Sequence, residues 1–152
     1  MRKGRELKNL PVIDVVSGQQ LGYVANFKIV NHEILAGLYL VSFDNRVLYL
    51  ARDYITRIGR DAVVVQAEAG QAIEGEPNWL DNAGINSSAV MTTKGEVLGV
   101  LTDVLLEETA GNILGYELSD GYFNDLLRGR KVIPTANIIT WGKDTVIVDE
   151  RV

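Results

Sequence analysis

Short runs of alternating hydrophobic and polar residues fill this chain, and glycine or polar turn residues separate them. Residues 12–16 form a β-branched run that stops at Ser17-Gly18, which predicts a strand followed by a turn. In the next run the alternation places on one face Tyr23, Ala25, Phe27 and Ile29, and on the other Asn26 and Lys28. A period of two predicts a half-buried strand here.

The same order of segments occurs twice along the chain. The matched pairs are residues 18–27 with 95–104, 36–40 with 114–118, and 55–65 with 138–148. In the middle pair, we expect matched residues to occupy equivalent core positions in the two copies. The matches are Ala36 with Leu114, Leu38 with Tyr116, and Leu40 with Leu118. Many short strands with regular turn signals favour a small closed barrel, because closure removes exposed strand edges.

The repeat therefore predicts an all-β chain of two tandem small barrels. The first covers residues 5–66 and the second residues 85–150, with an acidic linker at residues 67–84 between them. Trp79 lies in this linker. A tryptophan in a linker packs onto a neighbouring domain or contacts a ligand, and both alternatives stay open at this point.

Two motifs in this order resemble the PRC-barrel family. The first is Gly-x-x-Leu-Gly, then a hydrophobic residue, two further residues and Asn or Asp, and it ends at Asn26 and at Asp103. The second, Ile-x-x-Ile-Gly-x-Asp, begins at Ile55 and recurs in looser form from Ile138. The resemblance occurs in two copies that together cover nearly the whole chain, as in bacterial stand-alone tandem PRC-barrel proteins. The first copy departs from the pattern, since it has no proline equivalent to Pro134.

The resemblance implies two PRC-barrel-like β-barrels that bind a protein partner as an adaptor module, without a known catalytic motif. The same family also forms the C-terminal domain of a ribosome-maturation factor. It therefore implies an alternative role for this chain, in association with the ribosome or with RNA processing.

Composition narrows the function classes further. The 152-residue chain contains no cysteine, which excludes disulfides and thiolate metal sites, and we expect a cytoplasmic protein without a transmembrane segment. The net charge is −5, with the acidic excess in the second half, and this argues against a phosphate-binding surface there. The single histidine, His32, lies in a polar turn. We therefore predict no enzyme activity, no cofactor and no metal site.

An insertion in the second copy is the first candidate binding surface. Residues 119–130 are longer than the turn at residues 42–46 of the first copy, and they predict one short amphipathic helical turn. This turn either plugs a barrel end or contacts a partner. Its candidate partner-binding residues are Tyr122, Phe123, Leu126, Leu127, Arg128 and Arg130.

A second candidate surface lies on the outer face of the first copy. If Leu38 and Leu40 face the core, Tyr39 and Val41 face outward, whereas their counterparts are the polar residues Glu117 and Ser119. An apolar outer face indicates a packing partner. The linker, the other barrel and a second chain in a homodimer are the alternatives.

The N-terminal segment is basic. It is either a solvated tail or a weak contact to RNA, the ribosome or an anionic membrane surface. The residues concerned are Arg2, Lys3, Arg5 and Lys8.

Overall fold

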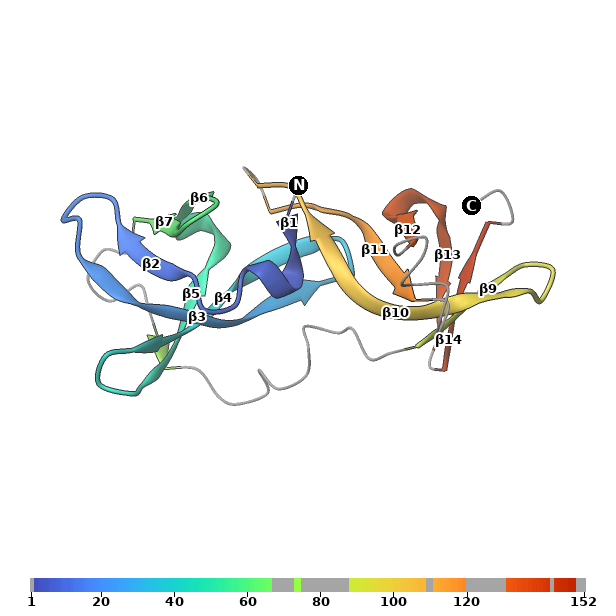
Figure 1. Cartoon of the computed structure of the whole chain (residues 1–152), viewed down its shortest axis with the longest axis horizontal. Helices are drawn as coiled ribbons and strands as arrows, with labels where there is room; N and C mark the ends of the chain where they lie inside the picture. The colour runs from blue at the N-terminus through green and yellow to red at the C-terminus, as the bar shows by residue number, and fades with distance from the viewer. Residues whose placement is uncertain are drawn as a thin grey trace. The chain divides into compact units, whose positions relative to one another are not determined.

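The computed structural model describes residues 2–66, 73–74, 88–108, 111–119, 131–142 and 144–149. Packing divides the chain into two compact units (Figure 1). The first unit contains Met1–Gly84 together with Leu106–Asn112, and the second contains Ile85–Leu105 together with Ile113–Val152.

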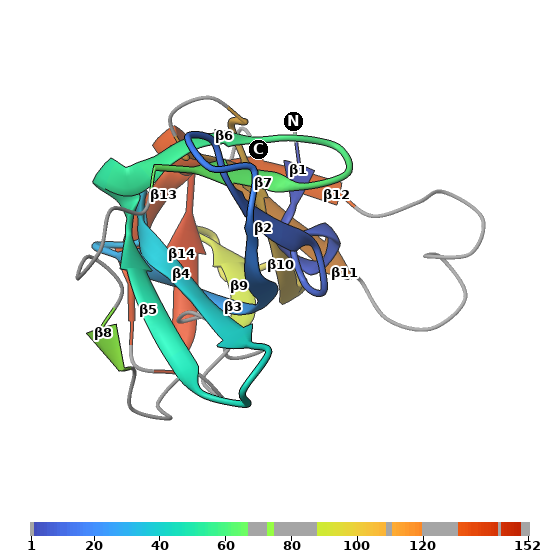
Figure 2. The same cartoon turned by 90° about the vertical axis from the view of Figure 1, so that its left-hand side faces the viewer.

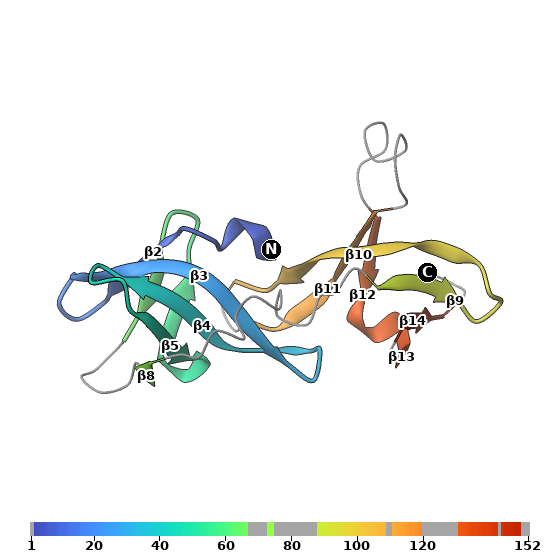
Figure 3. The ribbon, with the colours of Figure 1, turned by 90° about the horizontal axis from the view of Figure 1, so that it is seen from below.

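The first unit is built on one sheet with the strand order β6-β7-β2-β3-β4-β5-β8. Its strands are β2 (Pro11–Asp14), β3 (Gln20–Val30), β4 (Ile34–Ser42), β5 (Val47–Ala51), β6 (Ile55–Ile58), β7 (Val63–Val65) and β8 (Ile73–Glu74), and shorter elements are β1 (Arg2–Lys3), η1 (Gly4–Glu6) and η2 (Arg52–Tyr54). Neighbouring strands are antiparallel except β2 and β7, which are parallel. The long β3–β4 hairpin is seen along its length in Figure 3.

The second unit follows the same path, β13-β14-β9-β10-β11-β12. Its elements are β9 (Ala89–Thr92), β10 (Val97–Leu106), β11 (Ile113–Ser119), β12 (Lys131–Pro134), η5 (Thr135–Asn137), β13 (Ile138–Trp141) and β14 (Thr145–Val148). Here β14 and β9 form the parallel pair that corresponds to β7 and β2. Each strand of the first unit from β2 to β7 thus has a counterpart in the second unit.

These sheets confirm the prediction of an all-β fold with two similar units. The expected closure of each barrel is not seen, because no pairing among the described strands joins β6 to β5 or β13 to β12. The strands of the first unit nevertheless curl around a common centre (Figure 2). The helical turn expected within residues 119–130 lies outside the described residues, apart from Ser119, which ends β11.

Each sheet buries one face. The first unit buries Val12, Val24, Phe27, Leu35, Leu38, Leu40, Leu50, Ile58, Val63 and Val65, and the second buries Val90, Leu101, Val104, Ile113, Tyr116, Leu118, Ile133, Val146 and Val148. The predicted core positions Leu38, Leu40, Tyr116 and Leu118 are confirmed. Burial of such side chains contributes about 1.5–3 kcal/mol each to folding, so these two clusters supply the main stabilisation of each sheet.

A β-bulge in β3 overturns part of the predicted alternation. Val24 pairs with Leu40 and Asn26 pairs with Tyr39, so Ala25 has no cross-strand partner. The extra residue changes which side chains of the strand face the core on the N-terminal side of the bulge. Val24 is therefore buried and Tyr23 is 46% exposed, which makes the prediction of an inward Tyr23 wrong. Asn26, expected on the polar face, is only 3% exposed.

The second unit carries a similar local arrangement in β10. Val100 is exposed while Leu101 and Val104 are buried, so strict alternation fails in this strand too. At equivalent positions the Phe27 N–H donates to Asn26 Oδ1 (2.9 Å) and the Val104 N–H donates to Asp103 Oδ1 (2.8 Å). Each polar side chain thereby accepts a backbone hydrogen bond within the irregular part of its strand.

A further correction concerns the start of β11. Leu114, predicted to share the core with Leu38 and Leu40, is 45% exposed, whereas Ile113 is buried. In the corresponding β3–β4 pair the register shifts again between Lys28 and Ile29 of β3, and Leu35 of β4 is buried. Alternation therefore fails near the hairpin ends of both copies.

We predict that the oxygen at position 103 is needed more than its charge. Asp103→Leu leaves the buried Val104 N–H without this acceptor, and it should lower the free energy of unfolding by about 1–3 kcal/mol. Asp103→Asn keeps an Oδ1 acceptor and should cost less than half as much. Urea unfolding of both variants measures the difference, and equal losses would contradict the assignment.

Candidate protein-binding surface

An aromatic and aliphatic surface covers the outer side of β3, β4 and β5. We call it the aromatic face, and it consists of Tyr23, Tyr39, Val41, Phe43, Val47 and Tyr49. Cross-strand pairing aligns Tyr23, Val41 and Val47 in one row, and Asn26, Tyr39 and Tyr49 in the next. Paired residues project to the same side of a sheet, so these side chains share the side opposite to Leu38 and Leu40.

Two aromatic pairs organise this surface. The rings of Tyr39 and Tyr49 are 5.1 Å apart between centroids, and those of Tyr23 and Phe43 are 6.0 Å apart in a T-shaped arrangement. Phe43 is 65% exposed and Tyr23 is 46% exposed, while Tyr39, Val41 and Tyr49 are half-buried. Such pairs contribute about 0.5–1.5 kcal/mol beyond their buried area, and they fix the orientation of the rings.

Gly37 makes room for the Tyr49 ring. A Cβ at position 37 would lie 2.5 Å from Tyr49 Cζ and Oη and equally close to the Leu50 carbonyl oxygen. The ring therefore lies across the sheet toward β3, where Lys28 Nζ sits 5.9 Å from its centroid. A cation at this distance is attracted to the ring face. The aromatic face thus has a positive charge at one border.

The turn between β4 and β5 holds the opposite border in place. Ser42 N–H donates to the Arg46 carbonyl oxygen (2.9 Å), and Arg46 N–H donates to Ser42 Oγ (3.1 Å). Arg46 Nε also forms an ion pair with Asp44 at 2.8 Å. The hydroxyl of Ser42 donates to Asp44 and, with Arg46, holds the pKa of that carboxyl below its usual value. The backbone that carries the exposed Phe43 is therefore anchored on both sides.

The aromatic face offers apolar area, ring faces and hydroxyl groups with charges at its borders. An apolar centre rich in tyrosine with a polar border is the composition of protein-binding surfaces. The face contains no acid–base pair positioned against a nucleophile. What this arrangement can do is exclude water from a complementary surface and donate hydrogen bonds at its edge.

The sequence located two members of this surface. Tyr39 and Val41 lie where they were predicted, on the outer side of β4, and both are half-buried. The remaining predicted residues lie outside the described part of the chain; they are Tyr122, Phe123, Leu126, Leu127, Arg128 and Arg130. Sequence reasoning missed Tyr23 because of the bulge, and it missed Val47 and Tyr49 because the register of β5 against β4 was unknown.

The second unit has a different surface at the equivalent place. Glu117, the counterpart of Tyr39, pairs with Val132 across β11 and β12. Val132 is 46% exposed, but Glu117 is only 2% exposed, so the expectation that Glu117 is solvent-facing is wrong. The backbone oxygen of Glu117 accepts a hydrogen bond from the Thr102 hydroxyl at 3.1 Å. Where the first unit pairs Tyr39 with Tyr49, the described part of the second unit thus pairs Glu117 with Val132.

Comparison with known proteins relates the second half of the chain to a family. The PRC-barrel domain family matches residues 85–151. Residues 85–151 belong to the PRC-barrel family. The chain is also similar to the uncharacterised protein YrrD of Bacillus subtilis (strain 168), with 27% identity over 96 residues, which is 62% of this chain and 55% of that protein. The chain thus spans about half the length of the curated relative it matches.

The family match confirms the resemblance for the second unit, and the first unit repeats the strand order of this PRC-barrel domain. The aromatic face therefore lies on a PRC-barrel-like unit outside the matched range.

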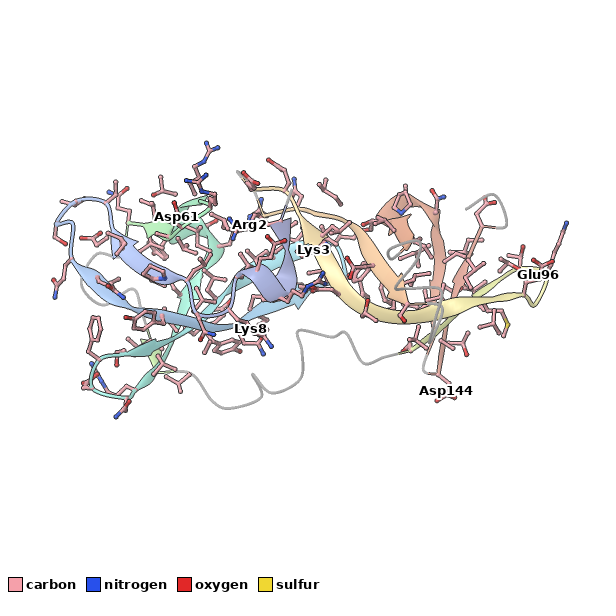
Figure 4. All side chains as sticks on the ribbon, in the orientation of Figure 1. Arg2, Lys3, Lys8, Asp61, Glu96 and Asp144 are labelled. Carbon is pink, nitrogen blue, oxygen red and sulfur yellow. The ribbon has the colours of Figure 1, made fainter. Side chains whose placement is uncertain are left out.

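The basic N-terminal segment is only partly exposed. Arg2 is 7% exposed, and its guanidinium donates to the backbone oxygens of Gly59 and Glu6 (Figure 4). Arg2 is therefore a structural residue, and its prediction as part of a solvated tail is wrong. Arg5 and Lys8 are exposed and Lys3 is half-buried, so contact of these three with RNA or a membrane stays a prediction.

The remaining candidate features are the single histidine, possible metal ligands and possible membrane-spanning helices. His32 occupies a hairpin turn with Asn31, both at positive φ, and partial burial lowers the pKa of its imidazole. No group of three or more potential metal ligands occurs among the described residues. In the same part of the chain, no helix has the length and apolar character needed to cross a bilayer.

The ionisation of Tyr49 provides a test of the packing of this face. Burial, and to a smaller degree the charge of Tyr39, raise the pKa of Tyr49. The stability that neutral Tyr49 contributes is therefore present below the unfolded pKa of about 10, and it is lost as the pH rises through the folded pKa. We predict that Tyr49→Phe removes one tyrosine whose ionisation, followed by ultraviolet absorbance, occurs above the ordinary range for tyrosine.

Urea unfolding should agree with this titration. Above about pH 10, the wild-type chain should lose stability more steeply with rising pH than the Tyr49→Phe variant. An unchanged slope in the variant would show that Tyr49 is not held neutral by the fold.

Proposed function

We propose that this chain is a non-enzymatic protein-binding module, and that the aromatic face of the first unit is its contact surface. The observation that carries the proposal is the exposure of Tyr23 and Phe43 beside the half-buried pair Tyr39 and Tyr49. Tyrosine and other aromatic anchors supply most of the energy of protein interfaces. The partner is a protein with an apolar patch of complementary shape.

Two further features support this proposal. The PRC-barrel family and its uncharacterised relative suggest a small non-catalytic domain. The absence of cysteine from the sequence fits an intracellular adaptor, and we place its action in the cytoplasm. A fold alone does not determine function, so the composition of the aromatic face is the main support for protein binding.

RNA binding is a second candidate function, which one observation favours. Tyrosines on an open sheet with Lys28 beside Tyr49 resemble the stacking platforms that hold unpaired bases. The net charge of −5 disfavours it, because such platforms rely on clustered positive charge. Protein binding therefore remains the better supported function.

The insertion at residues 119–130 stays a separate proposed contact. Tyr122→Asp/Leu126→Asp tests it, provided that circular dichroism shows the variant to be folded. Loss of a partner in this variant alone would assign the contact to the insertion and not to the aromatic face.

We predict that Tyr23→Ala/Phe43→Ala weakens partner binding by at least about 30-fold, because loss of interface anchors typically costs 2 kcal/mol or more. The intact chain and the variant are immobilised, and proteins captured from native extract are identified by mass spectrometry. The purified partner is then titrated calorimetrically. Val100→Ala is the matched control, since Val100 holds the position of Tyr23 in the second unit and is 38% exposed.

The salt and nuclease conditions separate the two functions. A protein partner should survive RNase and moderate salt, and it should be lost only with the Tyr23/Phe43 variant. Capture that disappears with RNase and falls steeply with salt would favour RNA instead. A folded Tyr23/Phe43 variant that keeps full affinity would remove the aromatic face as the binding surface.

A further inference from the structure

A segment from the second half of the sequence completes the first unit. Residues 106–112 pack with the first unit, whereas the strands on either side of them, β10 up to Leu105 and β11 from Ile113, belong to the second unit. This segment, which we call the hairpin end, therefore docks at a site formed by residues distant from it in sequence.

Main-chain bonds hold the hairpin end at two places. The Leu35 N–H donates to the Gly111 carbonyl oxygen at 3.1 Å, next to an antiparallel bridge between Ile34 and Asn112. The Ile58 N–H donates to the Glu108 carbonyl oxygen at 3.2 Å. These bonds use backbone atoms, as in strand addition between separate chains.

Side-chain packing makes the docking specific. Leu106 is completely buried. Gly111 has φ +70°, and a Cβ there would lie 3.1 Å from Leu35 Cδ2. A residue other than glycine would therefore be strained and would also press on Leu35. Position 111 is shaped for close approach of the two backbones.

Each copy of the chain therefore carries one hairpin end and one site that accepts it, formed around Ile34, Leu35 and Ile58. None of the bonds depends on which copy supplies the hairpin end. We propose that two copies exchange their hairpin ends, so that the partner at this site is a second copy of the chain. The exchange is reciprocal and closes with twofold symmetry, as in domain-swapped dimers.

The connection through residues 67–87 sets the balance between docking within one chain and docking between two. Tethering raises the effective concentration of the hairpin end at its own site, so internal docking dominates in dilute solution. A connection too short to span the two ends abolishes this advantage, and a second copy then takes the site.

The test uses the absence of cysteine from the chain. Ile34→Cys and Asn112→Cys place single thiols on bridge partners that are both exposed, at a separation suited to a disulfide. The two single variants are unfolded together, refolded at high concentration and oxidised, and disulfide-linked heterodimer is quantified on a non-reducing gel. Val16→Cys, 74% exposed, replaces Ile34→Cys as the collision control.

We expect at least about tenfold more heterodimer from the Ile34/Asn112 pair than from the Val16/Asn112 pair. Removal of residues 75–84 should increase the dimer further, as measured by light scattering. Gly111→Ala should reduce the linked product, whereas Gly95→Ala should not, because Gly95 has a similar φ of +83° with no atom within 4 Å of a Cβ.

Two results would overturn the exchange. In the first, the chain that carries both cysteines forms its internal disulfide fully, but the mixed single variants give only the collision level of heterodimer. In the second, the chain shortened by residues 75–84 is folded and remains a monomer at all concentrations. If the doubly substituted chain forms no disulfide at all, docking of the hairpin end itself is contradicted.

Discussion

The extra residue in β3 decides which side chains this protein presents to its surroundings. Without the bulge at Ala25, strict alternation from Phe27 back along the strand would place Tyr23 inward and Val24 outward. With it, Val24 joins Leu40 in the core and Tyr23 joins Val41 outside. The amide oxygen of Asn26 accepts the Phe27 N–H at this irregularity. One side-chain hydrogen bond therefore supports both the core and the aromatic face, because an unpaired buried donor here would oppose the bulge.

The succession of strands along the chain could be predicted from the sequence because it depends on local signals. Turn glycines such as Gly18 and Gly95, both at positive φ, end each first strand, and the valine-rich closing strands follow the turns at Gly59 and Gly142. These features recur in both copies, so the repeat was visible without alignment. Core positions in the middle of β4 and β11 followed from alternation, since both strands are regular there.

The composition of the aromatic face could be predicted only in part because it depends on register. Tyr39 and Val41 were found because they alternate with Leu38 and Leu40 on a single strand. Tyr49 enters the surface through its pairing with Tyr39, which no local pattern encodes. Phe43 lies in a turn whose other residues are polar, so the sequence pattern does not mark it as part of a surface. A one-residue shift in pairing moves every side chain of a strand to the other face, so small irregularities outweigh propensity here.

The two units show how one framework carries two different surfaces. Both have a buried polar residue whose oxygen accepts the next backbone N–H, Asn26 in one and Asp103 in the other, and both have the same strand path. Fold stability therefore constrains the strand path, the bulge and the inner face, and it leaves the outer face free to vary. Where one unit pairs Tyr39 with Tyr49, the other pairs Glu117 with Val132. Exposed apolar patches often mark interaction sites, so the rings on the outer side of the first unit support the proposal of a protein partner there.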